Sequence, residues 1–239
     1  FMRLIAEILL GLYRAALSTL RPNAGLTRLA FNPITNALFR QVPAAATART
    51  GEGYAIEVNR NDYHGRIFWL FGNNDWKVTH AACALSRPGD VFLDIGANHG
   101  TVGFAVGRIV GPEGHIHMFE LQAYLARRLR GVVEQNALGN VTVHEAALLD
   151  RDGETTMSMP RCYSSMASIM AEMQSDSRFT ERVTVRTADT RPYVESLTAD
   201  RPFGIKIDIE GAEPLVLERL IDHPSLRFIL FEGDKNQRA

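Results

Sequence analysis

Acidic side chains stand at the ends of several short apolar runs, in a spacing that could serve ligand binding. Asp94 lies near the end of residues 91–95, and Glu120 ends residues 115–120. Three further runs finish in the same way, at Glu145, Asp208 and Glu232. If the runs are parallel strands, these ends meet at one edge of a sheet, where open α/β sheets bind ligands. The spacing predicts a polar rim for a cationic or hydroxyl-rich ligand.

The loop over residues 94–100 (DIGANHG) carries the sharpest local pattern. Gly96 allows a tight turn with positive φ, and Gly100 lets the backbone approach a ligand at the start of the next helix. A dinucleotide-binding GxGxxG pattern from Gly96 would need glycines where Asn98 and Thr101 stand. A pyrophosphate needs close backbone approach there, so the loop favours a ligand without phosphates. S-adenosylmethionine is such a ligand.

Glu120 supports this interpretation. It lies about as far downstream of the loop as the acid that binds ribose hydroxyls in dinucleotide-binding folds. A carboxylate can accept two hydroxyl hydrogen bonds at once. Together with the preceding loop, Glu120 is predicted to bind a ribose.

Strand and helix patterns alternate from Val91 onward, which predicts an α/β fold with a doubly wound, mostly parallel sheet. The predicted strands are residues 91–95, 115–120, 141–144, 203–208 and 226–232. Helices are predicted after Gly100, around residues 125–133, over 189–197 and over 213–221. Residues 154–159 and 183–185 are predicted to be extended pieces that flank an irregular insert at 160–181, a candidate lid.

The N-terminal region predicts a helical extension. Apolar residues recur at helical spacing within residues 4–20, which Glu7 and Arg14 make a poor membrane span. Packing on the main domain or on a second subunit, or lying on a membrane surface, would cover such an amphipathic helix. Asn32-Pro33 reads as a turn and residues 43–50 as a connector. We therefore expect a helix and connector at 1–50 and a ligand-binding domain at 51–239. The aromatic residues of 63–76 are expected in its core, with a platform for the substrate as the alternative.

Composition weighs against some classes of function. The 239 residues have a formal net charge of −1, which gives the chain as a whole no electrostatic footprint for nucleic acid but leaves room for a local basic patch. Cys83 and Cys162 form no CxxC pair, so a disulfide framework or structural zinc site is not expected, and a reducing, cytoplasmic compartment fits.

The motifs, taken in order, resemble those of the FkbM family of methyltransferases. The resemblance covers roughly residues 88–232, and its combination of motifs is specific. The matching runs are 91–100, Phe119-Glu120, Glu134-Gln135-Asn136, 145–148 (EAAL), 205–213 (IKIDIEGAE) and Phe231-Glu232. The chain departs from the pattern in one respect, because few residues follow Glu232 where this class of fold usually adds two strands.

The resemblance implies a class I, Rossmann-like methyltransferase that transfers a methyl group from S-adenosylmethionine, commonly to a hydroxyl of a sugar, glycan or secondary metabolite. Glu120 would hold the ribose, and Glu145 would lie beside the adenine. The methionine end of the cofactor would be held by Asp94, Gly96, Asn98 and Gly100, with Thr101 as a neighbour.

Asp208 is the first candidate for the group that deprotonates or orients the acceptor, because it follows the fourth strand near the expected methyl group. Lys206 would set its charge state, and Glu210 is a third candidate. A structural ion-pair network of the three is the alternative. A divalent metal stays open, because Asp208, Glu210, Glu213 and Glu232 could supply oxygen ligands, but nothing in their spacing demands one. His64 and His99 are weaker candidate bases.

Two other functions stay open. A NAD(P)-dependent oxidoreductase is opposed by Asn98 and the missing third glycine. A non-catalytic module of the same fold cannot be separated by sequence, because cofactor binding does not prove turnover.

Overall fold

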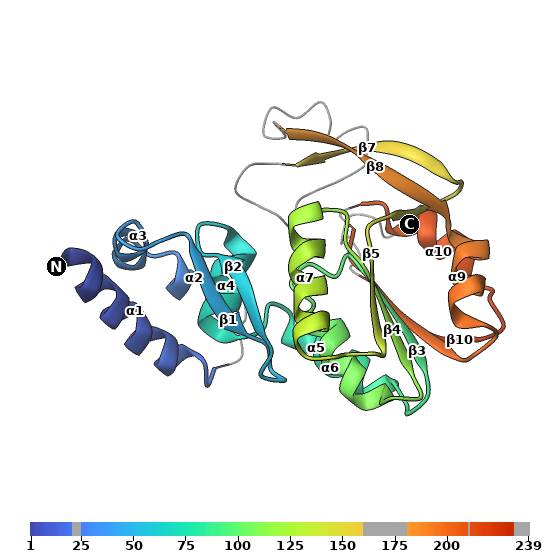
Figure 1. The fold of residues 1–239 in the computed structure, drawn as a ribbon, viewed down its shortest axis with the longest axis horizontal. Coiled ribbons are helices and arrows are strands. Elements are labelled where there is room, and N and C mark those ends of the chain that lie inside the picture. The colour runs from blue at the N-terminus through green and yellow to red at the C-terminus, as the bar shows by residue number, and fades with distance from the viewer. Residues whose placement is uncertain (21–24, 160–180, 210, 232–239) are drawn as a thin grey trace.

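A five-stranded parallel sheet forms the centre of the computed structural model (Figure 1), which describes residues 1–20, 25–159, 181–209 and 211–231. The strand order is β10-β9-β3-β4-β5, and every neighbouring pair runs parallel. The strands are β3 (Val91–Ile95), β4 (His115–Phe119), β5 (Val141–His144), β9 (Phe203–Ile207) and β10 (Leu226–Phe231). The predicted sheet and its α/β class are confirmed.

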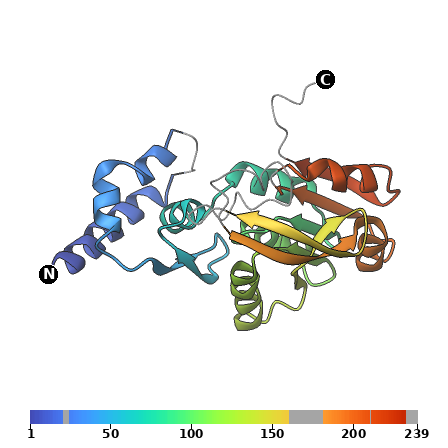
Figure 2. The same cartoon turned by 90° about the horizontal axis from the view of Figure 1, so that it is seen from above.

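Helices cover both faces of this sheet (Figure 2). Every residue of β3 is buried, and its side chains alternate between the faces, as the pleat requires. Phe92 packs with helices α6 and α7, whereas Leu93 and Ile95 pack with α9 and α10. The helices are α6 (Thr101–Val110), α7 (Ala123–Gln135), α9 (Thr190–Thr198) and α10 (Glu213–Leu220).

The strand order reverses at β3, although all the strands run in the same direction. The chain runs from β3 outward through β4 to β5, and later returns to the other side of β3 as β9, followed by β10. Open α/β sheets leave a crevice for ligands at such a switch point, beyond the carboxyl ends of the strands. The crevice here lies where β3, β4 and β9 end.

A second, three-stranded sheet follows β5, in the order β6-β8-β7. It consists of β6 (Ala147–Leu149), β7 (Gly153–Met159) and β8 (Glu181–Asp189), with β7 antiparallel to β8 and β6 parallel to it. The two extended pieces expected here are confirmed, but the sequence did not predict that they pair as a separate sheet with β6. The irregular insert at 160–181, a candidate lid, lies outside the described residues except for Glu181.

The N-terminal part contains more structure than the sequence predicted. The expected first helix is α1 (Met2–Leu17). The remaining elements are α2 (Thr27–Ala30), α3 (Pro33–Phe39), β1 (Ala45–Arg49), β2 (Ala55–Asn59), α4 (Tyr63–Phe71) and α5 (Trp76–Leu85). No helix in the described ranges is long and apolar enough to cross a membrane.

Two local predictions here were wrong. Asn32-Pro33 is not a simple turn but the start of α3, because the Asn32 side chain accepts hydrogen bonds from Ile34 N and Thr35 N, and Pro33 suits the first helical position. The supposed connector contains β1, which pairs with β2 in an antiparallel hairpin. That hairpin straddles residue 50, and the division into 1–50 and 51–239 stays a prediction.

The N-terminal elements share one core with the central sheet. Helix α1 packs on α3 and α4. Phe68 and Trp69 of α4 belong to the same buried cluster as Phe92 of β3 and Phe104 of α6. The expectation that the aromatic segment contributes to the core is confirmed for Phe68, Trp69 and Phe71.

Candidate functional site

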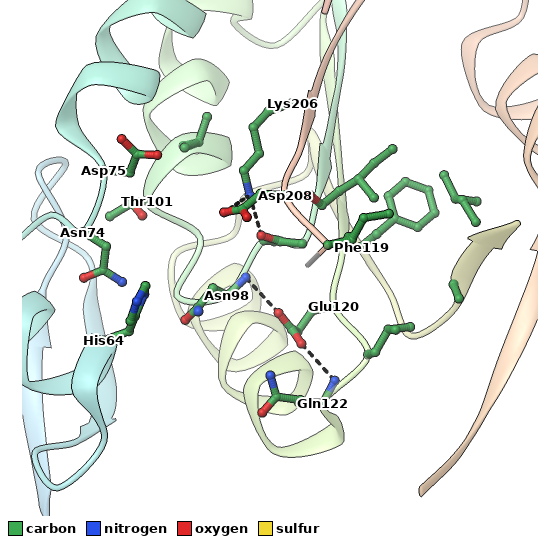
Figure 3. A pocket seen from close by; sticks show the side chains of 18 of the residues that line it. His64, Asn74, Asp75, Asn98, Thr101, Phe119, Glu120, Gln122, Lys206 and Asp208 are labelled. Carbon is green, nitrogen blue, oxygen red and sulfur yellow. Dashed lines mark hydrogen bonds and ion pairs between the residues drawn. The ribbon is translucent and has the colours of Figure 1, made fainter. Parts of the chain in front are cut away.

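A cavity of about 220 Å³ lies at the carboxyl ends of β3, β4 and β9 (Figure 3). Its walls come from the β3–α6 loop, the segment after β4, the second sheet, the end of β9, and the α4–α5 region. The polar residues that line it are His64, Asn74, Asp75, Asn98, Thr101, Glu120, Gln122, Lys206 and Asp208. The cavity therefore lies where the strand-end acids predicted a ligand.

Glu120 follows β4 and is only 5% exposed. Its Oε2 accepts a hydrogen bond from Asn98 N at 2.8 Å, and its Oε1 accepts one from Gln122 N at 2.9 Å. Burial raises the pKa of Glu120 to about 7, although these two amides favour the charged form. Each oxygen keeps a lone pair, so the fixed carboxyl group can accept hydrogen bonds from ligand hydroxyls.

The β3–α6 loop is shaped by the neighbouring strand. Gly96 has φ +78°, and a Cβ there would lie 1.9 Å from Asp208 O, so only glycine allows the loop to pass the end of β9. Asn98 also has positive φ, which asparagine tolerates better than most residues. Its Oδ1 is buried without a hydrogen-bond partner in the described structure. Gly96, Asn98 and Thr101 all line the cavity.

Lys206 connects the ends of β3 and β9. Its Nζ lies 3.3 Å from Asp94 Oδ1 and 3.7 Å from Asp208 Oδ2, and it donates a hydrogen bond to Gly96 O at 2.5 Å. Burial alone would lower the pKa of Lys206, but Asp94 and Asp208 outweigh it and the pKa is raised. The predicted association of Lys206 with Asp208 is present, and both residues line the cavity.

Asp94 lies behind the cavity wall rather than in it. Its side chain is completely buried, and Oδ2 accepts a hydrogen bond from Gly103 N at 2.9 Å. With Oδ1 beside Lys206, the carboxylate links the end of β3 to the first turn of α6. The geometry makes Asp94 a residue that positions Lys206 and the loop.

Gly100 and Glu145 also lie away from the cavity. A Cβ at Gly100 would meet side-chain atoms of Phe104 and Leu129 at 2.6 and 2.7 Å, so this glycine serves core packing instead of the expected approach to a ligand. Glu145 Oε2 accepts a hydrogen bond from Arg130 Nη1 at 3.0 Å, and its neighbours 146–148 line the cavity in its place. Glu210 and Glu232 lie outside the described residues.

The opposite wall comes from the region before β3. His64 is on α4, and Asn74 and Asp75 precede α5, where Asp75 Oδ1 accepts a hydrogen bond from Val78 N at 3.3 Å. Burial lowers the pKa of His64 and raises that of Asp75. Asn74 Oδ1 is buried without a partner in the part of the chain described. His64 was predicted only as a weaker base. Asn74 and Asp75 were not predicted, because in the sequence they look like ordinary loop and helix-cap residues.

His99 and Glu213 have structural roles. His99 is buried against Phe68 with ring centroids 5.3 Å apart, and burial lowers its pKa to about 3. Glu213 accepts hydrogen bonds from Ile209 N and Gly211 N at 3.0 and 2.9 Å. Within the described ranges, no group of three or more His, Cys, Asp or Glu side chains is arranged to hold a metal ion.

The polar groups of the cavity suit a ligand rich in hydrogen-bond donors. Carboxyl groups of Glu120, Asp75 and Asp208 face it, and no donor among the described residues reaches the amide oxygens of Asn74 and Asn98. The described lining residues include one cation, Lys206, and no arginine. An ammonium, a sulfonium and ribose hydroxyls fit this set, whereas a pyrophosphate would meet like charge.

Comparison with known proteins agrees with this chemistry. The family model of the FkbM methyltransferase domain matches residues 94–237. No curated protein matches the chain.

Solved structures with similarity to the chain include two methyltransferases and a protein in complex with AdoMet. An S-adenosylmethionine-dependent methyltransferase from Aquifex aeolicus is 20% identical over 31% of this chain and 43% of its own, with a TM-score of 0.28. Precorrin-6y C5,15-methyltransferase from Geobacter metallireducens is 15% identical over 60% of this chain and 53% of its own, with a TM-score of 0.33. M. jannaschii TYW2 in complex with AdoMet is 17% identical over 45% of this chain and 48% of its own, with a TM-score of 0.34. This chain thus spans about half the length of these proteins.

The family model covers more than half of the chain, from the end of β3 past β10, and includes most of the cavity. The chain belongs to the FkbM family of S-adenosylmethionine-dependent methyltransferases.

Proposed function

We propose that this protein transfers a methyl group from S-adenosylmethionine, bound in the cavity, to a hydroxyl group of a sugar, glycan or other small metabolite. The observation that carries the proposal is the arrangement of Glu120. Two backbone amides fix its carboxyl group at the end of β4, beside a glycine turn whose walls do not suit a pyrophosphate.

The lining residues suggest how the cofactor is held. Glu120 would accept hydrogen bonds from the ribose hydroxyls. Gly96 and Asn98 would contact the methionine end, where the free Asn98 Oδ1 can accept a hydrogen bond from an ammonium group. Apolar side chains of the cavity, among them Phe119 and Leu148, would pack on the adenine. Asp94 would act indirectly, through Lys206 and the loop.

When bound, the cofactor would supply an electrophilic methyl group on a sulfonium. The protein would contribute alignment and removal of water from the acceptor, effects worth roughly 7–11 kcal/mol in well-oriented reactions. Asp208 would accept the proton of the acceptor hydroxyl, and Lys206 would hold Asp208 in place. The carboxyl groups around the cavity favour a neutral, hydroxyl-bearing acceptor over a phosphorylated one.

His64 is a second candidate for the proton acceptor. It lines the cavity from the α4 side, opposite β9 (Figure 3), and burial lowers its pKa, so that the imidazole is uncharged at neutral pH. Asp208→Asn and His64→Gln distinguish the two. We expect Asp208→Asn to lower kcat about 10²–10⁴-fold with little change in cofactor affinity. If only His64→Gln has this effect, His64 is the base.

Two measurements separate the proposal from its alternatives. Calorimetric titration should show binding of S-adenosylhomocysteine and none of NAD, and the reverse result would favour an oxidoreductase. Formation of S-adenosylhomocysteine with a panel of sugars and hydroxylated metabolites would show turnover. Binding without turnover for any acceptor would favour a non-catalytic module.

A further inference from the structure

Helix α1 is apolar on both of its sides. Ala6, Leu10 and Leu17 are buried toward α3 and α4. The opposite side is exposed, with Leu4 63%, Ile8 54% and Leu12 66% accessible, at a spacing that aligns them on one face. The other large apolar side chains exposed on α1 are Met2, Ile5 and Leu9. We call these six residues the outer face of α1.

The outer face contains no charged residue. The charged residues of α1 are Arg3, Glu7 and Arg14. Glu7 pairs with the buried Arg60, and the Arg14 guanidinium lies over the Trp69 ring, so both side chains point toward the body of the protein. A row of exposed leucine and isoleucine side chains without charge is unfavourable in water and marks an interaction surface.

The region around α1 is strongly basic. Residues 1–50 contain six arginines and a single acid, Glu7, which gives a formal charge of +5, whereas the whole chain has −1. Arg3, Arg28 and Arg40 are exposed. A surface that covers the outer face would therefore be bound more tightly if it carried negative charge.

We propose that the N-terminal region binds an anionic membrane surface, with α1 lying in the plane of the interface and its outer face among the lipid acyl chains. An apolar helix face buries hydrocarbon in this way, and nearby arginines are attracted to anionic headgroups. Pairing of two copies through α1 would instead bring two regions of charge +5 together. Figures 1 and 2 show α1 at the end of the molecule away from the parallel sheet, so the elements around the cavity need not move.

The test is sedimentation of the full chain with phosphatidylcholine vesicles, with and without phosphatidylglycerol, at low and high salt. We expect binding to the anionic vesicles that weakens with salt, and little binding to neutral ones. Leu12→Glu should reduce binding at least tenfold. Ile221→Glu is the matched control, because Ile221 is 69% exposed just after α10 at the other end of the chain, and it should bind as the unmodified protein does.

The charge is tested separately by Arg28→Gln with Arg40→Gln, which should weaken binding to anionic vesicles about fivefold per arginine. Circular dichroism checks that each variant is folded. Equal binding to neutral and anionic vesicles, or unchanged binding of Leu12→Glu, would overturn the proposal. So would absence of vesicle binding together with a dimer in light scattering that Leu12→Glu dissociates, which would assign the outer face to a second copy.

Discussion

The raised pKa of Glu120 should make ligand affinity depend on pH. With a pKa of about 7, its carboxyl group is partly protonated at neutral pH, and only the ionised form accepts hydrogen bonds at both oxygens. Affinity for S-adenosylhomocysteine should therefore fall as the pH drops from 8 to 6, approaching tenfold per unit at the acid end. Calorimetry over this range checks it. Glu120→Gln should bind weakly with no such dependence, and a persisting pH dependence in that variant would assign the titration to another group.

Gly96 and Gly89 provide a comparison between two glycines with positive φ. An alanine at either position is strained by about 1–2 kcal/mol. A Cβ at Gly89 has open space, whereas one at Gly96 would overlap Asp208 O. Gly96→Ala should therefore lower the free energy of unfolding by clearly more than Gly89→Ala and also reduce turnover, measured by urea denaturation and methyl transfer. Equal losses in both variants would show that the loop does not press on β9.

Only some of the residues around the cavity could be predicted from sequence. Glu120, Asn98 and Asp208 stand next to apolar runs, and the position at a strand end brings them together. Asp94 has the same sequence context, but the pleat turns its side chain toward α6, where Gly103 N binds it. Nothing in the sequence shows that Asn74 approaches the loop after β3, because that contact depends on how α4 and α5 pack.

At the scale of elements, β4 and β5 carry a pair of histidines, His117 buried and His144 half-buried, that should make stability depend on pH. His117 Nδ1 lies 3.0 Å from His144 Nε2, and His144 Nδ1 lies 3.1 Å from Tyr193 OH. Burial lowers the pKa of His117 to about 3 and that of His144 to about 4. In the unfolded chain these two histidines bind protons below about pH 6.5, whereas in the folded chain they stay neutral until the pH approaches 4. The free energy of unfolding therefore falls as the pH drops below 6.5.

His117 alone should account for about 2 kcal/mol of the loss between pH 7 and pH 5. Urea denaturation at the two pH values measures it. His117→Gln should show a smaller loss by that amount, and His80→Gln, at an exposed position, should behave like the unmodified protein. An identical loss in His117→Gln would mean that the pKa of this histidine is the same in the folded and unfolded chains.

Elements with long, regular patterns were predictable, and those defined by partners were not. β3 and β9 are buried along their whole length and are uncharged except for Asp94 and Lys206, because both faces of the sheet are covered. β1 has the sequence AATAR, which carries no distinctive strand pattern and is held by pairing with β2. β6 has only three residues, and its place beside β8 follows from tertiary contacts.

The whole molecule should unfold as one unit, because its main core cluster runs from the N-terminal helices to the parallel sheet. Phe68 of α4 is fully buried in that cluster. Phe68→Ala should lower the free energy of unfolding by about 3–5 kcal/mol. Denaturation followed by fluorescence and by circular dichroism should give one coincident transition. Ile221→Ala, at an exposed site, should change little, and two separate transitions in the unmodified protein would contradict a shared core.

The central claim is that the fixed carboxyl group of Glu120 holds the ribose of S-adenosylmethionine at the end of β4. The most direct test compares the affinities of two variants, Glu120→Ala and Glu145→Ala, for S-adenosylhomocysteine. Glu145→Ala is the control, because it also removes an acid but Glu145 does not line the cavity. Loss of hydrogen bonds to a charged group, about 1.5–3 kcal/mol, predicts roughly 10–100-fold weaker binding for Glu120→Ala and nearly unchanged binding for Glu145→Ala. Unchanged affinity in a folded Glu120→Ala protein would contradict the account.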